Sequence, residues 1–232
     1  MSAPTVAMVL AAGLGTRMRP LTESRPKALL RVAGRTRLDR AIDAAVAGGA
    51  QRVVVNVHHF ADQMRAHLAR RRTPPIVISD ETDALLETGG GVVRALPLLG
   101  RAPFFAINAD AVWTGAAPAG QLAAAWARND ADALLLLVRR DRALAYSRPG
   151  DFDLIDGRPQ RRSGETAAYV YTGAQILRPE ALRDAPSGPF SMNLIWDRLL
   201  AQGRLGACVH DGAWVDVGTP AGLSAAEGAL EQ

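Results

Sequence analysis

The sequence predicts a Rossmann-like α/β domain with three layers, a mostly parallel mixed sheet and a small antiparallel appendage. The chain has 232 residues, which fits one large domain. Apolar residues make up 48% of it and charged residues 22%, as in globular proteins, so the chain can bury a core. Short apolar runs alternate with amphipathic stretches through the first part of the chain. This alternation is typical of a parallel sheet that is covered by helices.

The apolar runs of the first part have the length of buried strands and end at turn signals. The run Val6 to Leu10, for example, leads into Ala11-Ala12-Gly13. Between the runs, apolar residues recur at helical spacing, and Gly48-Gly49 ends the first of these helices. The expected strands are 6–10, 52–57, 76–78, 104–107 and 133–138, and the expected helices are 38–46, 60–68, 91–98 and 122–127.

The second part of the chain changes character, and we expect the antiparallel appendage from about residue 140. A hairpin is predicted over 151–162, because Asp156-Gly157 is a strong turn signal between two short runs. Pro220 stands at a favourable first position for a last helix. The other expected elements are strands at 168–176, 204–210 and 215–217 and a helix at 192–201.

Composition excludes several classes of protein. Cys208 is the only cysteine, so neither an internal disulfide framework nor a multi-cysteine zinc site is expected. No apolar run approaches the roughly 18 residues of a membrane span, and no basic leader precedes the first strand, which together favour a cytoplasmic protein without membrane contact. The net charge of +4 is scattered and aromatic residues make up 5%, which favours a small polyanionic ligand over nucleic acid. The oligomeric state is not readable.

A glycine-rich turn follows the first strand, at the edge where α/β proteins bind ligands. Glycines such as Gly13 and Gly15 let backbone N–H groups approach phosphate oxygens, and Arg17 adds a cation. The turn lacks the Gly-Lys-Ser/Thr of a Walker A loop, and Met18 stands where a dinucleotide fingerprint has its third glycine. All but one of the 27 basic residues are arginines. The exception, Lys27, therefore marks a place where a compact point charge is needed.

The segment from Leu10 to Leu30 resembles the opening of the sugar-1-phosphate nucleotidyltransferases. That family begins Leu-Ala-Ala-Gly-x-Gly-Thr-Arg and continues with Pro-Lys, a pattern that this chain matches nearly without a gap. The resemblance implies that Arg17 neutralises the leaving pyrophosphate and that Lys27 contacts the reacting phosphates. It also implies a nucleotide-binding half, 1–140, and a sugar-binding half, 141–232, within one domain. The loop residues implied in nucleotide binding are Ala11, Ala12, Gly13, Gly15 and Thr16.

Two aspartates are candidate ligands of Mg²⁺, which nucleotidyl transfer needs to offset phosphate charge. Asp110 ends the fourth strand, and its carboxylate is expected at the same sheet edge as the glycine-rich turn. Asp216 lies between two valines in Trp-Val-Asp-Val-Gly-Thr. Both resemble the metal aspartates of the family. Ala109 departs from the family pattern, which usually has glycine before the first aspartate.

A second glycine-rich segment, Glu87 to Gly91, opens a predicted helix with Thr88 as its N-cap. By resemblance, Thr88 and Gly89 hold the nucleobase, and Glu81 lies near it. The Glu-Thr-Gly-Gly-Gly form resembles the small uridylyltransferases that act on N-acetylmuramate 1-phosphate in the salvage of peptidoglycan sugars. The guanylyltransferase form of this segment is absent.

The sugar site is less marked. The candidate contacts are Asn108, Glu165, Gly173 and Asn193. Larger relatives grip the sugar phosphate with a second lysine, which this chain lacks. Arg161, Arg162 and Glu165 lie near its place, and the choice among them stays open.

The expected function is Mg²⁺-dependent transfer of a nucleoside monophosphate from an NTP, with UTP favoured, to a sugar 1-phosphate, with N-acetylmuramate 1-phosphate favoured. Glucose, mannose and heptose 1-phosphates remain alternatives. A non-catalytic module that senses nucleotide sugars is a second hypothesis. A nicotinamide-dependent oxidoreductase is disfavoured by the missing third glycine.

Overall fold

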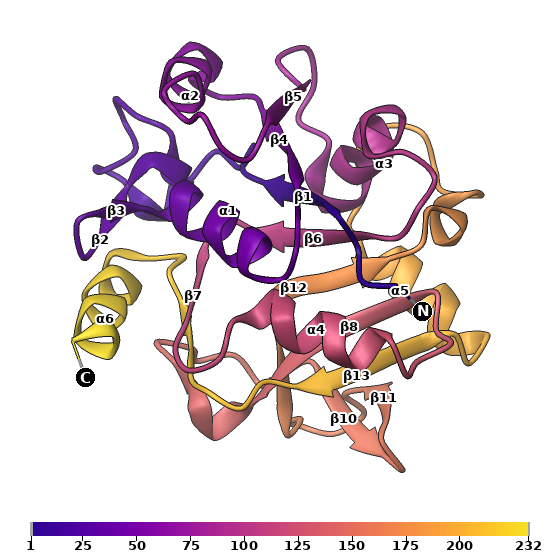
Figure 1. Ribbon diagram of the computed structural model, residues 1–232. Helices are drawn as coiled ribbons and strands as arrows, with labels where there is room; N and C mark the ends of the chain where they lie inside the picture. The colour runs from indigo at the N-terminus through magenta and orange to yellow at the C-terminus, as the bar shows by residue number, and fades with distance from the viewer. Residues whose placement is uncertain (1, 232) are drawn as a thin grey trace.

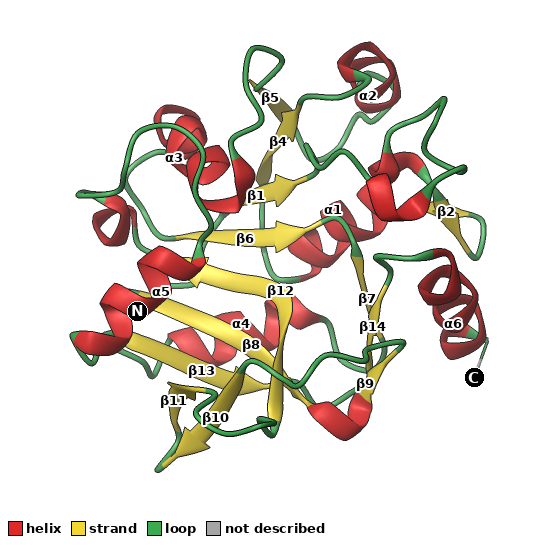
Figure 2. Ribbon diagram, turned by 180° about the vertical axis from the view of Figure 1, so that it is seen from behind, coloured by secondary structure: helices red, strands yellow, loops and turns green. Residues whose placement is uncertain are grey.

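A nine-stranded mixed sheet forms the middle layer of the computed structural model, which describes residues 2–231 (Figures 1 and 2). Its order is β11-β10-β12-β6-β1-β4-β5, and β8 pairs with both β12 and β13. The predicted fold class is confirmed. The strands are β1 (Val6–Leu10), β4 (Arg52–Val57), β5 (Ile76–Asp80), β6 (Phe104–Asn108), β8 (Ala133–Arg139), β10 (Phe152–Ile155), β11 (Arg158–Arg161), β12 (Tyr169–Leu177) and β13 (Leu205–Val209).

Strand directions divide the sheet into two regions. β1 runs parallel to β4 and β6, and β4 runs parallel to β5, so these four strands end at one edge. β12 is antiparallel to both β6 and β8. Its register shifts between Tyr171 and Gln175, where Gly173 adopts a φ of 84°. This bulge lets one long strand serve the parallel region and the β10–β11 hairpin, which extends the main sheet.

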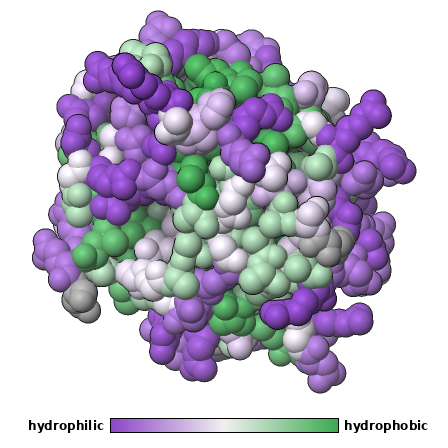
Figure 3. All heavy atoms as spheres, viewed as in Figure 1, coloured by the Kyte–Doolittle hydropathy of each residue, from purple (hydrophilic) through white to green (hydrophobic). Residues whose placement is uncertain are grey.

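Helices cover both faces of the sheet (Figure 1). Buried residues of α1, α2 and α4 pack on one face, and those of α3 and α5 pack on the other. β8 serves both layers, because Leu134 and Leu136 join the first core while Leu135 and Leu137 join the second. Small, weakly hydrophobic side chains occupy the middle of the face over α4, with hydrophilic ones around it (Figure 3). The helices are α1 (Arg37–Ala47), α2 (Ala61–Leu68), α3 (Glu87–Leu99), α4 (Pro118–Trp126), α5 (Asn193–Ala201) and α6 (Pro220–Leu230).

Two smaller sheets complete the fold. One has three strands, β7 (Ala111–Trp113), β14 (Trp214–Asp216) and β9 (Ala143–Leu144), and Figure 2 shows it beside the main sheet. The other pairs β2 (Arg31–Val32) with β3 (Arg35–Thr36). A separate small core joins the three-stranded sheet to α6 and β2; its buried members are Val32, Val112, Val215, Val217 and Ala226.

Most predicted elements occur at or near their predicted bounds, but the short strands β2, β3, β7 and β9 were not predicted, and the hairpin expected in the appendage belongs to the main sheet. The largest shifts in bounds concern helix starts. α3 begins at Glu87 rather than at residue 91, and its N-cap is Leu86, so the N-cap role predicted for Thr88 is wrong. The Thr88 hydroxyl instead accepts a hydrogen bond at 2.9 Å from the backbone N–H of Met192, just before α5. Within residues 2–231, no helix has the length and apolarity to cross a membrane.

Substitutions of two glycines of α6 test how closely this helix packs against β14. A Cβ at Gly222 would overlap the backbone carbonyl of Asp216, whereas a Cβ at Gly228 would meet no atom within 4 Å. Gly222→Ala should lower the free energy of unfolding by about 1–3 kcal/mol, because the backbone has to move. Gly228→Ala should raise it by about 0.5–1 kcal/mol through lost chain entropy. Urea unfolding of both variants measures the difference, and equal effects would contradict the packing of α6 described here.

Candidate active site

Two cavities lie at the carboxyl edge of the parallel strands. The first, which we call the loop cavity, follows the glycine-rich turn after β1, and the second, which we call the bulge cavity, follows the bulge of β12. The side chains that line both cavities are Thr88, Asn108 and Asp110. The loop cavity is also lined by Ala11, Ala12, Gly13, Lys27, Arg37, Asn56, Glu81 and Glu87. The bulge cavity is also lined by Arg17, Arg148, Asp151, Arg161, Gly173, Asn193 and Asp216.

The glycine-rich turn is fixed by contacts of its two ends. The backbone N–H of Ala11 donates to the Asn56 side chain at 2.6 Å. Gly15 has a φ of 70°, and its carbonyl accepts from the Thr22 hydroxyl at 2.8 Å. A Cβ at Gly15 would come within 2.8 Å of Lys27 Cβ. Glycine at this position therefore lets the turn pack directly against the segment that carries Lys27.

Lys27 and Asp110 form an ion pair between the two cavities. Lys27 Nζ lies 2.7 Å from Asp110 Oδ2, and the exposed fractions of the two side chains are 13% and 37%. Burial alone would raise the pKa of Asp110, but the charges of Lys27, Arg37 and Arg17 and the hydrogen bond from Lys27 lower this pKa to about 2. Asp110 is therefore ionised throughout the neutral range.

Strand pairing brings Asp216 beside Asp110. In the β14–β7 ladder Asp216 lies opposite Ala111, and the N–H of Val217 donates to the carbonyl of Asp110 at 3.2 Å. The Asp216 carboxylate accepts from the N–H of Gly218 at 3.0 Å and pairs with Arg148 at 3.2 Å. Two carboxylates from distant parts of the sequence thus face the same cavity.

The donor set of this pair fits Mg²⁺ that arrives with phosphate. No group of three or more His, Cys, Asp or Glu side chains able to hold a metal occurs within residues 2–231. A dedicated protein cage is therefore absent from that part of the chain. Mg²⁺ commonly uses one or two carboxylates and takes its remaining ligands from water and substrate phosphates. Asp110 and Asp216 are the residues that would hold it.

Glu81 is a buried acid with an unused oxygen. Its side chain is 1% exposed, Oε1 accepts from Asn56 at 2.8 Å, and Oε2 has no hydrogen-bond partner. Burial raises the pKa of Glu81 above its ordinary value, although Asn56 partly opposes this. A Cβ at Gly91 would come within 2.9 Å of Oε1, so the glycine-rich start of α3 allows the close approach of this acid.

The bulge cavity has an arginine fixed on an aromatic surface. Arg161 donates to Asn193 Oδ1 at 2.9 Å and to Asp197 at 2.7 Å. Its guanidinium lies 4.7 Å from the centre of the Phe152 ring. Gly173 adjoins this cavity from the bulge, where a Cβ would come within 3.1 Å of the Asn108 side chain. Asn108 and Gly173 are thereby brought together.

The structure gathers most of the sequence-predicted residues around the two cavities and leaves four outside their linings. Gly15 and Thr16 shape the turn. Gly89 donates its N–H to the Phe190 carbonyl at 2.9 Å, and the Phe190 ring fills the space of a Cβ. Glu165 is exposed in the segment between β11 and β12.

Sequence reasoning missed three residues of the site. Asn56 carries a signal, because it is a lone polar residue within the apolar strand Val-Val-Val-Asn-Val. Arg37 and Arg148 carry none, since arginine is so common in this chain that no single one stands out.

Glu81→Gln should stabilise the free protein at neutral pH. Because the pKa of Glu81 is raised on folding, its ionisation costs stability as pH rises above the unfolded value of about 4.3. The variant should gain about 1 kcal/mol at pH 8 and little at pH 4, as measured by urea unfolding. The neighbouring Asp80 is a control of opposite sign, because hydrogen bonds from Thr82 lower its pKa to about 2. Asp80→Asn should lose stability at pH 8, and a gain there would contradict this account.

Comparison with known proteins agrees with this arrangement. The chain is 46% identical over 238 aligned positions to N-acetylmuramate alpha-1-phosphate uridylyltransferase of Caulobacter vibrioides, covering 99% of this chain and 98% of the relative. The enzyme of the same name from Neisseria meningitidis serogroup B is 32% identical, with 95% and 96% covered. These relatives are similar along their whole length.

Solved structures share the fold at low sequence identity. The inositol-1-phosphate CTP transferase of T. maritima superposes with a TM-score of 0.81 at 17% identity, covering 97% of each chain. A UDP-glucose pyrophosphorylase in complex with UDP-glucose superposes with a TM-score of 0.82 at 16% identity, covering 100% of this chain and 99% of the other. A MobA-like NTP transferase domain matches residues 7–186, which is most of the sequence. The chain therefore belongs to the MobA-like NTP transferase family.

Proposed function

We propose that this protein transfers the uridylyl group of UTP to N-acetylmuramate 1-phosphate in a Mg²⁺-dependent reaction that releases pyrophosphate. One observation carries the proposal: two cavities of different lining meet at Thr88, Asn108 and Asp110. A group can pass between ligands bound in the two cavities only at this junction. The two full-length relatives that carry this activity in their names support the choice of substrates.

UTP fits the loop cavity. The backbone of the glycine-rich turn and Lys27 are suited to its phosphates. Uracil presents an imide N–H, and the unpartnered Oε2 of Glu81 is a buried acceptor for it. Base recognition by Glu81 thus explains why an acid stays buried with one oxygen unused.

The sugar phosphate fits the bulge cavity, where two arginines take the place of the lysine of larger relatives. Arg148 and Arg161 both line this cavity, whereas Glu165 does not. Asn193, fixed by Arg161, and Gly173, against Asn108, are suited to the sugar. Residues 1–140 would then supply most of the nucleotide site and residues 141–232 most of the sugar site. Arg17 belongs to the first half but lines the bulge cavity.

The reaction is a single displacement. An oxygen of the sugar phosphate forms a bond to the α-phosphorus, the bond from this phosphorus to the bridging oxygen of the β-phosphate breaks, and pyrophosphate leaves with the electron pair. A phosphate monoester is already an anion near neutral pH, so no general base is needed. Mg²⁺, when bound, offsets phosphate charge. Lys27 and Arg17 contribute positioning and charge from either side of Asp110.

UTP is available in the cytoplasm, so the proposed reaction is a cytoplasmic one. It would belong to the salvage of peptidoglycan sugars. The test is pyrophosphate release with Mg²⁺, with four nucleoside triphosphates crossed against the 1-phosphates of N-acetylmuramate, N-acetylglucosamine, glucose and mannose. Turnover should be confined to UTP with N-acetylmuramate 1-phosphate. Turnover with another pair would correct the substrate, and folded protein that binds nucleotide without any turnover would favour a sensing module.

Lys27→Arg should lower kcat on the order of 100-fold without unfolding the protein. The wider guanidinium binds as a planar fork and does not reproduce a point charge between Asp110 and the phosphates. Steady-state kinetics measures the rate, and circular dichroism checks the fold. Turnover at the wild-type rate would remove the special role of this sole lysine.

Asp216→Asn should raise the Mg²⁺ concentration needed for half-maximal rate about tenfold or more, because one anionic ligand is lost. Asp151→Asn is the matched control, since Asp151 lines the same cavity but accepts from the N–H of Tyr171, a bond that an amide oxygen can keep. A titration of rate against Mg²⁺ compares the two variants. An unchanged curve for Asp216→Asn would exclude Asp216 from the metal site.

A further inference from the structure

Arg37 is a buried cation that the proposed reaction does not use. It is the first residue of α1, its side chain is 0% exposed, and none of its three guanidinium nitrogens has a hydrogen-bond partner within residues 2–231. A buried charge without partners is costly, and a cation at the positive end of a helix adds to that cost. Some compensating interaction must hold it there.

The negative charges of Asp110 and Asp216 compensate for the cost of burying Arg37. Burial lowers the pKa of Arg37, and the negative charges of Asp110 and Asp216 oppose this change. No ion pair within 4 Å joins Arg37 to any carboxylate of the described chain. Arg37 also lines the loop cavity beside Lys27 and Asp110. Its charge therefore acts on both carboxylates through space, without occupying their oxygen atoms.

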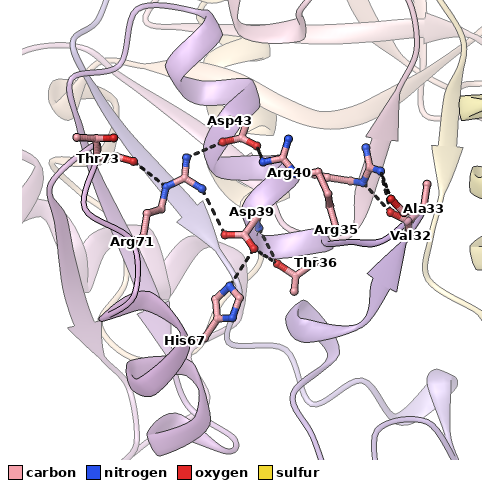
Figure 4. Close-up of polar contacts among 10 residues, drawn as sticks. All are labelled: Val32, Ala33, Arg35, Thr36, Asp39, Arg40, Asp43, His67, Arg71 and Thr73. Atoms are coloured by element: carbon pink, nitrogen blue, oxygen red, sulfur yellow. Dashed lines mark hydrogen bonds and ion pairs between the residues drawn. The ribbon is translucent and has the colours of Figure 1, made fainter.

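Contacts on the outer face of α1 hold the helix start in place. The Thr36 hydroxyl donates to Asp39 at 2.6 Å and caps the helix, and His67 contacts the same carboxylate at 3.0 Å (Figure 4). Arg71 pairs with Asp39 and Asp43 from the segment after α2 (Figure 4). Because these contacts fix the outer face of α1, Arg37 is held on the inner face of the helix.

The charges around the two carboxylates do not favour a free cation. Four cations face the two acids, namely Arg17, Lys27, Arg37 and Arg148. These four cations weaken the attraction that the two carboxylates exert on a free divalent ion. A nucleoside triphosphate that carries Mg²⁺ still has net negative charge, so the same surroundings attract it. Among the four cations, Arg37 is the one that is fully buried.

We propose that Arg37 is a fixed counter-charge that keeps the Asp110–Asp216 pair from binding free divalent metal, so that the metal enters with the nucleotide. The inference deepens the proposed function and rests on its assignment of these two carboxylates to Mg²⁺. Arg37 is a positioning residue here, because it acts through the carboxylates and not on the reacting atoms.

The test measures Mn²⁺ binding to the protein without nucleotide, by the loss of the free Mn²⁺ signal in electron paramagnetic resonance. Arg37→Met removes the charge and keeps an unbranched chain of similar length. Mn²⁺ should bind to this variant at least about tenfold more tightly than to the wild type, because a nearby unit positive charge is gone. A purely structural role of Arg37 would weaken the metal site instead, so the sign of the change separates the two.

Four further variants make the result specific. Arg37→Lys keeps the charge and should bind Mn²⁺ as weakly as the wild type. Arg40→Met removes the same charge one turn along α1, where Arg40 donates to the Val32 carbonyl, and should change nothing. Arg37→Gln replaces Arg37→Met if the latter does not fold. Asp216→Asn combined with Arg37→Met should abolish the gained affinity.

Unchanged or weaker Mn²⁺ binding to the folded, charge-neutral variant would overturn the inference. Gained affinity that survives Asp216→Asn would also overturn it, because the metal would then lie elsewhere. The proposed function is judged separately by pyrophosphate release from the wild-type protein. A protein that turns over UTP while Arg37→Met leaves Mn²⁺ binding unchanged would refute this inference and leave the function standing.

Discussion

The ion pair between Lys27 and Asp110 connects the parts of this protein on which the proposed activity depends. Its 2.7 Å contact joins the segment after the glycine-rich turn to the end of the fourth parallel strand. Because Gly15 packs against Lys27 Cβ, the turn is placed by the same contact. Asp216 is then placed beside Asp110 by the β14–β7 ladder, which α6 supports through its close approach at Gly222. The glycine-rich turn, the two carboxylates and α6 are thus connected through the Lys27–Asp110 ion pair.

Charge, more than shape, distinguishes the two cavities. The loop cavity combines backbone N–H groups with a buried acid, Glu81, whose pKa is raised by burial. The bulge cavity contains arginines held by carboxylates and aromatic rings, such as the half-buried Arg161 on Phe152. Between them, Asp110 stays ionised because cations surround it. Phosphates entering from either side therefore meet positive charge.

The sequence was sufficient to predict the sheet, because short apolar runs such as Val6–Leu10 end at turns and occur between helical patterns. It also identified the cavity residues that lie in contiguous motifs, among them Lys27 and Asp110. Contacts between segments that are distant in the chain could not be predicted from the sequence. Thr88 binds Met192 across 104 residues and is not a helix cap, and nothing in the local pattern reveals that partner. Arg37 was missed for a related reason, because its proposed role depends on its burial and on two carboxylates from distant segments, Asp110 after β6 and Asp216 in β14.

The central claim is direct transfer between two ligands that meet at Asp110. The alternative is a covalent nucleotidyl intermediate, for which Lys27 is the natural amine, although Lys27 Nζ is already paired with Asp110. The stereochemistry at phosphorus distinguishes the two most directly. With a chiral α-thio analogue of UTP and N-acetylmuramate 1-phosphate, one displacement predicts inversion of configuration at the α-phosphorus in the nucleotide sugar. Retention would require two displacements and would contradict this account of the site.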